Sequence, residues 1–185
     1  SKYWSKHYTT WLKSIKFNTW YSQSSLHEMI EIVDFLRTKL LHVNKQLRQI
    51  ESDSPYTHTI GLLRSIPGVG LITALTLLTE LDNISRFGNL DRLCSYVGLI
   101  PSTHSSGDNH HSGRITSRSN TELRSMLIES AWIAIRHDPA LSMKYLKFRQ
   151  RMKANKAIVR IAKRLLSRIK HVLDNNEPYT TGKVS

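Results

Sequence analysis

The sequence predicts a mainly α-helical protein, in which a long coiled-coil-like helix precedes a compact helical domain. Apolar residues recur at helical spacing, capping residues precede several of these stretches, and no long alternating β pattern is present. Hydrophobic residues make up 39% of the 185 residues and include four Trp, which favours a packed core. We expect three parts: an aromatic and basic opening segment with the long helix over 1–56, the helical domain over 57–174, and a tail over 175–185.

A heptad pattern predicts the long helix over 24–52. Two sets of apolar residues each recur every seven positions; they are Leu26, Val33, Leu40 and Leu47, and Met29, Leu36, Val43 and Ile50. This pattern is typical of the a and d positions of a coiled coil. The helix therefore either joins other copies of the chain in a dimer or tetramer, or packs within an intramolecular bundle, and the pattern alone does not choose.

Capping and turn signals predict the remaining helices. We expect helices over 58–65, 71–81, 90–97, 119–136, 139–153 and 155–173. Ser119 and Glu122 have the spacing of a capping box, and Asp138 before Pro139 has the pattern of an N-cap. The tail from residue 174 is expected to fray. Cys94 stands alone among apolar residues, which predicts a small buried side chain and fits a reducing cytoplasm.

A polar stretch over 98–120 interrupts these helices. It holds six Ser, two Thr, three Gly and three His, which predicts a long Ser/Gly/His-rich loop. Ser105 and Ser106 are candidate nucleophiles, although their spacing alone is a weak signal because Ser-Gly dipeptides are common in ordinary loops. Three histidines could carry a proton or donate to phosphate: His104, His110 and His111. They lack the Cys or carboxylate neighbours of a zinc site, so we predict no metal there.

The charge distribution points to a polyanionic partner. The net charge is +13. The segment between residues 110 and 170 contains fifteen Lys and Arg but only three Asp and Glu. Nucleic acid is the commonest partner of such a surface, and a solvated basic face is the alternative. The candidate phosphate-binding residues are Arg114, Arg118, Arg124, Lys156, Arg160, Lys163 and Arg164. Mean hydropathy is −0.35 and no apolar run approaches the roughly 18 residues of a membrane span, so we expect no membrane partner.

A helix–hairpin–helix pattern lies upstream of the polar stretch. The segment IPGVG over 66–70, with Ala74 four residues later, allows a tight turn before a helix. Gly68 and Gly70 could bring bare backbone N–H groups close to a phosphate, beside the positive end of the following helix. A connection that serves only packing is the alternative.

Taken together, IPGVG, ALTLLTELDNISRFGNLDRLCSYVGLIPSTHSSG and GRITSRSNTELRSMLIESAW resemble the C-terminal domain of the IS-one-ten transposases and the related Piv-type DNA invertases. The resemblance covers residues 62–132. It implies that Ser106, directly before a glycine, attacks a DNA phosphodiester and forms a covalent phosphoserine. It also implies phosphate contacts from the segment that begins at Arg114 and includes Asn120 and Arg124.

The resemblance carries further expectations about partners and location. It implies DNA and guide RNA as partners, a bacterial cytoplasm at the nucleoid, and magnesium bound by an N-terminal RuvC-like domain that these residues lack. The sequence departs from the family pattern at His111 and Ser112, where two basic residues are common, and at Ser119, where glycine is favoured. Two rival functions are a non-catalytic helix–hairpin–helix module that binds nucleic acid and a coiled-coil assembly domain.

Overall fold

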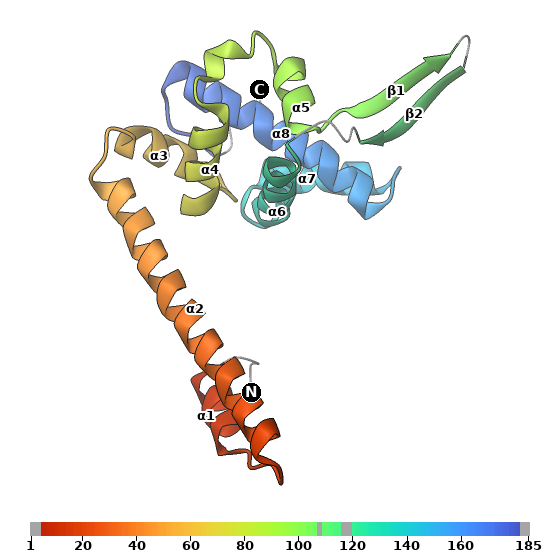
Figure 1. The fold of residues 1–185 in the computed structure, drawn as a ribbon. Coiled ribbons are helices and arrows are strands. Elements are labelled where there is room, and N and C mark those ends of the chain that lie inside the picture. Colours follow the sequence, from red (N-terminus) through yellow and green to blue (C-terminus); the bar gives the residue numbers. More distant parts are fainter. Residues whose placement is uncertain (1–4, 107–108, 116–119, 182–185) are drawn as a thin grey trace. The chain divides into compact units, whose positions relative to one another are not determined.

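The computed structural model describes residues 5–106, 109–115 and 120–181, with the backbone alone over 101–106 and 109–115. The chain divides into two compact units, Ser1–Gln49 and Ile50–Ser185. The predicted mainly α class is confirmed (Figure 1). The elements are α1 (Lys6–Ser14), α2 (Trp20–Ser52), α3 (Thr57–Arg64), α4 (Leu71–Leu81), η1 (Ile84–Arg86), α5 (Leu90–Val97), β1 (Pro101–Ser106), β2 (Asn109–Ile115), α6 (Thr121–His137), α7 (Pro139–Arg149) and α8 (Ala154–Asn175).

The first unit is built on α2, which confirms the predicted long helix and begins four residues before its expected start. The preceding segment forms α1, a helix that the sequence patterns did not predict. Side chains tie the two helices together: Lys13 Nζ lies 2.8 Å from Asp34 Oδ2, and Arg37 Nη1 donates to Thr9 Oγ1 at 3.1 Å. These contacts reach only the first half of α2.

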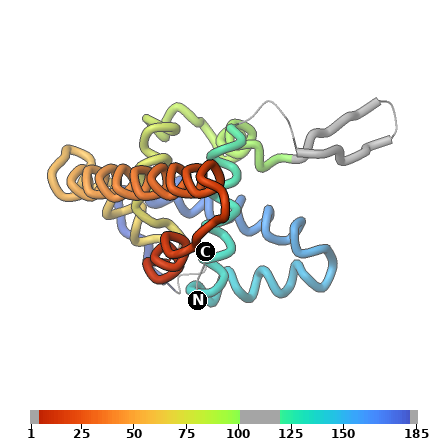
Figure 2. The backbone as a smooth tube through the Cα atoms, turned by 60° about the horizontal axis from the view of Figure 1, so that its bottom comes forward, coloured from red at the N-terminus to blue at the C-terminus, as the bar shows by residue number. Residues whose placement is uncertain are grey.

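The second unit is organised around α8. Its apolar face, which includes Ile158, Ile161, Leu165 and Ile169, is buried, and the helix contacts α3, α5, α6, α7 and η1. Figure 2 shows α7 and α8 running side by side, joined by a short turn. Cys94 lies in the same core, fully buried as predicted, and burial raises the pKa of its thiol to about 11. Among the helices described, none combines the length and apolar composition needed to cross a bilayer.

Two predicted helix ends are wrong. Asn120, and not Ser119, caps α6: its Oδ1 accepts from the Leu123 backbone N–H at 2.9 Å, which a short amide side chain does as well as a serine. Ser119 itself lies outside the described residues. Helix α7 ends at Arg149 instead of residue 153, because the backbone turns there into α8. The predicted N-cap at Asp138 is confirmed, with Oδ1 accepting from the Leu141 N–H at 3.0 Å.

The polar stretch is not simply a loop. Strands β1 and β2 pair antiparallel within it, from Ser106 opposite Asn109 to Pro101 opposite Ile115. Backbone hydrogen bonds hold such a ladder, so it can form without the apolar alternation that the sequence lacks. The two residues between the strands are Gly and Asp, a dipeptide typical of two-residue hairpins, and they lie outside the described residues.

The segment after α8 is held in place at Tyr179, where we expected fraying. The Tyr179 hydroxyl donates to Asp138 Oδ2 at 2.6 Å, and its backbone N–H donates to Ser65 Oγ at 2.7 Å. The Arg168 guanidinium lies 4.9 Å above the tyrosine ring and also binds Asp138. Burial and the hydrogen bond to Asp138 raise the pKa of Tyr179 to about 12. The tail therefore joins the α7 start, α8 and the end of α3.

Candidate nucleic-acid interface

Ser106 lies at the far end of the β1–β2 ribbon, in the last pair of the register. The ribbon leaves the helical body of the second unit next to α5, as Figure 1 shows. Because successive residues of a strand point to opposite faces, the register places Ser106 on the same face as His104, Asn109 and His111. Ser105 shares the other face with His110, directly opposite it. The two candidate nucleophiles therefore have different histidine neighbours.

Arg114 and Arg124 do not lie at the end of the ribbon where Ser106 lies. Arg114 lies near the base of the ribbon, five residues along β2 from Asn109, which corresponds to about 16 Å at the rise of a β-strand. Arg124 lies half-buried in the second turn of α6, in the helical body. Arg118 lies outside the described residues. Along the ribbon itself, the register brings Ser106 close to histidines and not to Arg114.

The base of the ribbon is fixed by a clamp of three residues, Glu80, Tyr96 and Asn120. The Asn120 side-chain amide donates to Glu80 Oε2 at 2.5 Å, and its backbone N–H donates to the Tyr96 carbonyl at 3.2 Å. The Tyr96 hydroxyl donates to the Glu80 carbonyl at 3.2 Å. These bonds join the end of α4, the end of α5 and the start of α6, and α5 and α6 are the helices that flank the ribbon in the sequence.

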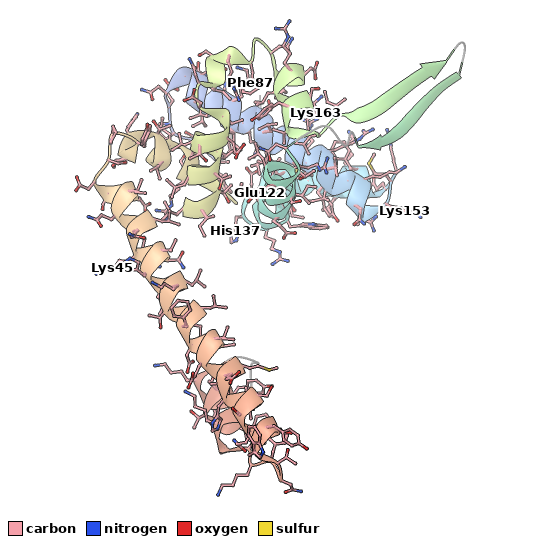
Figure 3. All side chains as sticks on the ribbon, in the orientation of Figure 1. Lys45, Phe87, Glu122, His137, Lys153 and Lys163 are labelled. Atoms are coloured by element: carbon pink, nitrogen blue, oxygen red, sulfur yellow. The ribbon has the colours of Figure 1, made fainter. Side chains whose placement is uncertain are left out.

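An arginine stack adjoins the clamp. The Arg86 guanidinium lies 4.6 Å from the Phe87 ring centroid and 5.1 Å from that of Tyr96, and it donates to the Glu80 carbonyl at 3.1 Å. Figure 3 labels Phe87 next to α5. Sequence reasoning missed Glu80, Arg86 and Tyr96, because only the packing of α4 against α5 and α6 brings them together.

The predicted phosphate-binding residues of α8 differ in exposure and in the side chains that they contact. Arg160 and Arg164 are exposed and both stack on the Phe148 ring of α7, at 5.5 and 5.9 Å from its centroid. Lys156 is exposed near the start of the helix. Lys163, labelled in Figure 3, is half-buried and binds Asp91 Oδ1 at 2.9 Å, so its charge is partly neutralised. The stacked arginines are therefore best prepared to bind phosphate, because their side chains are already ordered.

The two glycines of the segment over 66–70, Gly68 and Gly70, have different surroundings. Gly68 adopts φ +90°, and a Cβ built on it would lie 2.3 Å from the Ser130 carbonyl oxygen of α6. Gly70 adopts φ −86° as the N-cap of α4, and a Cβ there meets nothing within 4 Å. The structure thus places Gly68 against α6, whereas Gly70 lies at an open helix N-terminus where a phosphate could approach.

Fold and site together define a basic helical domain that carries a serine- and histidine-bearing ribbon on a fixed base. The model of the Transposase IS116/IS110/IS902 family matches residues 61–147 of this domain. The match includes the hairpin, the clamp, the whole ribbon and α6.

Individual transposases and a gene-inverting protein are also similar to this chain. The chain is 30% identical over 164 residues to the transposase for insertion sequence element IS1111A of Coxiella burnetii, a match covering 83% of this chain and 44% of the relative. It is 32% identical over 141 residues to a protein of insertion element IS110 from Streptomyces coelicolor, covering 74% and 35%. It is 31% identical over 144 residues to the pilin gene-inverting protein of Moraxella bovis, covering 76% and 45%. The chain therefore spans less than half the length of these relatives.

Proposed function

We propose that the chain is the serine-bearing C-terminal domain of a bacterial DNA transposase or site-specific recombinase, with Ser106 as its nucleophile. The observation that carries the proposal is the position of Ser106 at the end of a ribbon inside the family-matched residues. The names of the relatives, a transposase and a gene-inverting protein, support DNA as the substrate.

The proposed reaction proceeds in two balanced transesterifications. Ser106 Oγ attacks a DNA phosphorus, its proton passes to a base, and the bond from phosphorus to the 3′ oxygen breaks to give a phosphoserine and a free 3′ hydroxyl. A 3′ hydroxyl then attacks the phosphoserine and releases the serine. The number of phosphodiester bonds is conserved, so no nucleotide triphosphate is needed. His111 and His104 share the ribbon face of Ser106 and are the proposed proton carriers.

We propose that the basic residues hold the phosphates of the substrate. The preordered Arg160 and Arg164, together with Lys156, would follow the DNA backbone, and the open N-terminus of α4 at Gly70 would accept another phosphate. Arg114, Arg118 and Arg124 would neutralise charge on the reacting phosphate once other components complete the site. The resemblance supports two further proposals: guide RNA as a second polyanionic partner, and work at the bacterial nucleoid.

Magnesium, which the resemblance implies for a RuvC-like domain, does not fit the residues described here. Among them, no group of three or more His, Cys, Asp or Glu side chains could hold a metal ion. No step of the proposed reaction is therefore assigned to magnesium, and its binding by a separate domain stays a proposal.

Changing Ser106 to Ala in a full-length transposase that contains this domain tests the nucleophile. We expect recombination to fall by roughly 10⁴-fold or more, as is typical when an enzyme loses its nucleophile. The covalent protein–DNA complex, seen as a shifted band of labelled DNA in a denaturing gel, should disappear. DNA binding should be retained and should weaken steeply with added salt.

Ser105→Ala is the matched control, because it removes a hydroxyl from the opposite face of the same strand. It should leave the covalent complex intact. His111→Ala should slow formation of the complex by about 10²-fold, whereas His110→Ala should not. A complex that survives Ser106→Ala and vanishes with Ser105→Ala would reverse the assignment. Recombination that persists without either hydroxyl would favour the rival function, a non-catalytic binding module.

We also propose that α2 pairs with α2 of a second copy of the chain. Its heptad stripe is left exposed along the helix, with Met29, Leu36, Leu40 and Val43 all at 46% or more. An isolated helix that exposes a regular apolar stripe gains stability by burying it against an identical stripe. This supports the predicted dimer or tetramer over the intramolecular bundle.

Replacing Leu40 and Val43 by Glu should convert the chain to a monomer, measured by light scattering or sedimentation. Charges at a and d positions of a paired coiled coil would be buried without partners. The control places glutamates at His42 and Lys45, which lie off the stripe; Figure 3 labels Lys45. That variant should keep the oligomeric state of the parent. A parent chain that is monomeric at all concentrations would contradict the pairing.

A further inference from the structure

Four exposed aromatic side chains lie in the connection between α1 and α2 and in the adjoining helices. We call them the aromatic turn; they are Trp11 of α1, Phe17 of the connection, and Trp20 and Tyr21 at the start of α2. Trp20 is 82% exposed and Tyr21 is 61% exposed, and their rings meet edge to face at 5.9 Å. An exposed pair of touching aromatic rings marks an interaction site, because each ring could bury a large apolar area.

The backbone under the aromatic turn is fixed. The Gln23 side chain accepts from the Phe17 backbone N–H at 2.9 Å and donates to the Ile15 carbonyl at 3.2 Å. The Thr19 hydroxyl donates to Ser22 Oγ at 2.7 Å. The rings are therefore presented by an ordered connection, which lowers the conformational entropy that a ligand would have to remove on binding.

The charge around the aromatic turn selects the kind of partner. Residues 1–27 contain four Lys and no Asp or Glu. Lys6 and Lys16 are exposed, on α1 and within the turn, whereas Lys13 binds Asp34. Exposed rings beside the exposed cation of Lys16, with the Asp34 carboxylate already bound by Lys13, match a strand that offers both π-faces and phosphates. That combination is the recognition mode of proteins that bind unpaired nucleotides.

We propose that the aromatic turn binds single-stranded nucleic acid by stacking unpaired bases on Trp20 and Tyr21, with Lys16 contacting the phosphates. This site lies in the first unit and is distinct from the ribbon and from the α8 cations of the second. It does not depend on Ser106 being a nucleophile. The chain thus holds one surface suited to duplex phosphates and another suited to unpaired bases.

The test measures binding of fluorescent oligonucleotides to the 185-residue chain by anisotropy. The ligands are a uridine strand, a thymidine strand, an abasic strand with the same number of phosphates, and a duplex. The double variant Trp20→Ala with Tyr21→Ala should bind a single strand roughly 10-fold or more weakly, because two stacking platforms are lost. Its duplex affinity should be unchanged. Leu41→Ala removes an equally exposed apolar side chain from the same unit and is the control.

Each arm of this experiment decides something. The parent chain should bind the abasic strand as weakly as the double variant binds the intact strand, since stacking is lost in both cases. Comparison of uridine with thymidine strands separates RNA from DNA as the source of the bases. Equal loss of single-strand and duplex binding, or no loss at all, would overturn the proposal. The proposal would also be overturned if the double variant bound nucleic acid normally but no longer bound anionic lipid vesicles or no longer self-associated.

Discussion

Replacing Asp138 by alanine is expected to lower the free energy of unfolding by about 3–5 kcal/mol, the cost of removing one partner from a buried ion pair. The carboxylate is only 1% exposed, and three groups depend on it: the Leu141 N–H, the Tyr179 hydroxyl and the Arg168 guanidinium. Without it the α7 cap is lost and Arg168 keeps a charge with no counterion. Chemical denaturation of the purified chain, followed by circular dichroism, measures the change.

Asp91→Ala is the matched control for that experiment. Asp91 also binds a basic residue of α8, Lys163, but its side chain is 77% exposed. Solvent screens such a pair, so its loss should cost less than about 1 kcal/mol. Asp138→Asn keeps a capping side chain and should fall between the two. Equal costs at the two positions would show that the buried cluster around Tyr179 does not stabilise the fold.

The stability that Asp138 contributes should depend on pH. Burial by itself raises the pKa of the carboxyl, but the hydrogen bonds from Tyr179 and Leu141 and the Arg168 charge outweigh it and lower the pKa below its usual 3.8. A lowered folded-state pKa means that the contribution is full above the unfolded pKa and is lost as pH falls through the folded value. The stability gap between the parent chain and Asp138→Ala should therefore be constant near neutrality and close below about pH 4.

Gly68→Ala is expected to destabilise the second unit by about 2–5 kcal/mol. The backbone there has φ +90°, where any L side chain is strained by roughly 1–2 kcal/mol. The added Cβ would also overlap the Ser130 carbonyl oxygen and press on the Ala134 backbone N–H, so α6 would have to move. Thermal unfolding of the variant should show a lower melting temperature with the helical content of the native baseline unchanged.

Gly70→Ala separates folding from phosphate binding at the same hairpin. Its φ is ordinary and the space around it is open, so stability should change by about 1 kcal/mol or less. If a phosphate approaches the start of α4, however, the new methyl group should weaken duplex binding. A Gly70→Ala chain with unchanged stability and unchanged affinity would remove the hairpin from the proposed interface and leave Gly68 a packing role alone.

The helices were predictable because their signals are local. Three of the expected helices begin directly after a capping residue, such as Asn89 before α5 and Asp138 before α7. The apolar face of α8 repeats every three to four residues, and a period of this kind is set by the helix itself. Where two capping candidates were adjacent, at residues 119 and 120, the local signal did not choose between them.

The ribbon was not predictable in the same way. Its strands are polar and show no alternation of apolar and polar residues. Their pairing therefore depends on backbone hydrogen bonds, which no side-chain pattern in the sequence indicates. The clamp shows the same difficulty, because Glu80 and Asn120 are forty residues apart and meet only after α4 and α6 pack. Tyr179 likewise belongs to a segment that the sequence predicts to fray, and only the structure shows that its hydroxyl donates to Asp138.

By itself the sequence determined the helical class, the long heptad helix, the concentration of positive charge and the family that the serine-bearing segment resembles, because composition, periodicity and motif order are properties of neighbouring residues. Only the tertiary structure shows which histidines share a face of the ribbon with Ser106. It also shows that Gly68 packs against α6 while Gly70 has open space around it, and that Asp138 is buried and accepts a hydrogen bond from Tyr179 of the tail. Those facts depend on contacts between distant segments, whose geometry is set by how the helices pack and not by any one stretch of the chain.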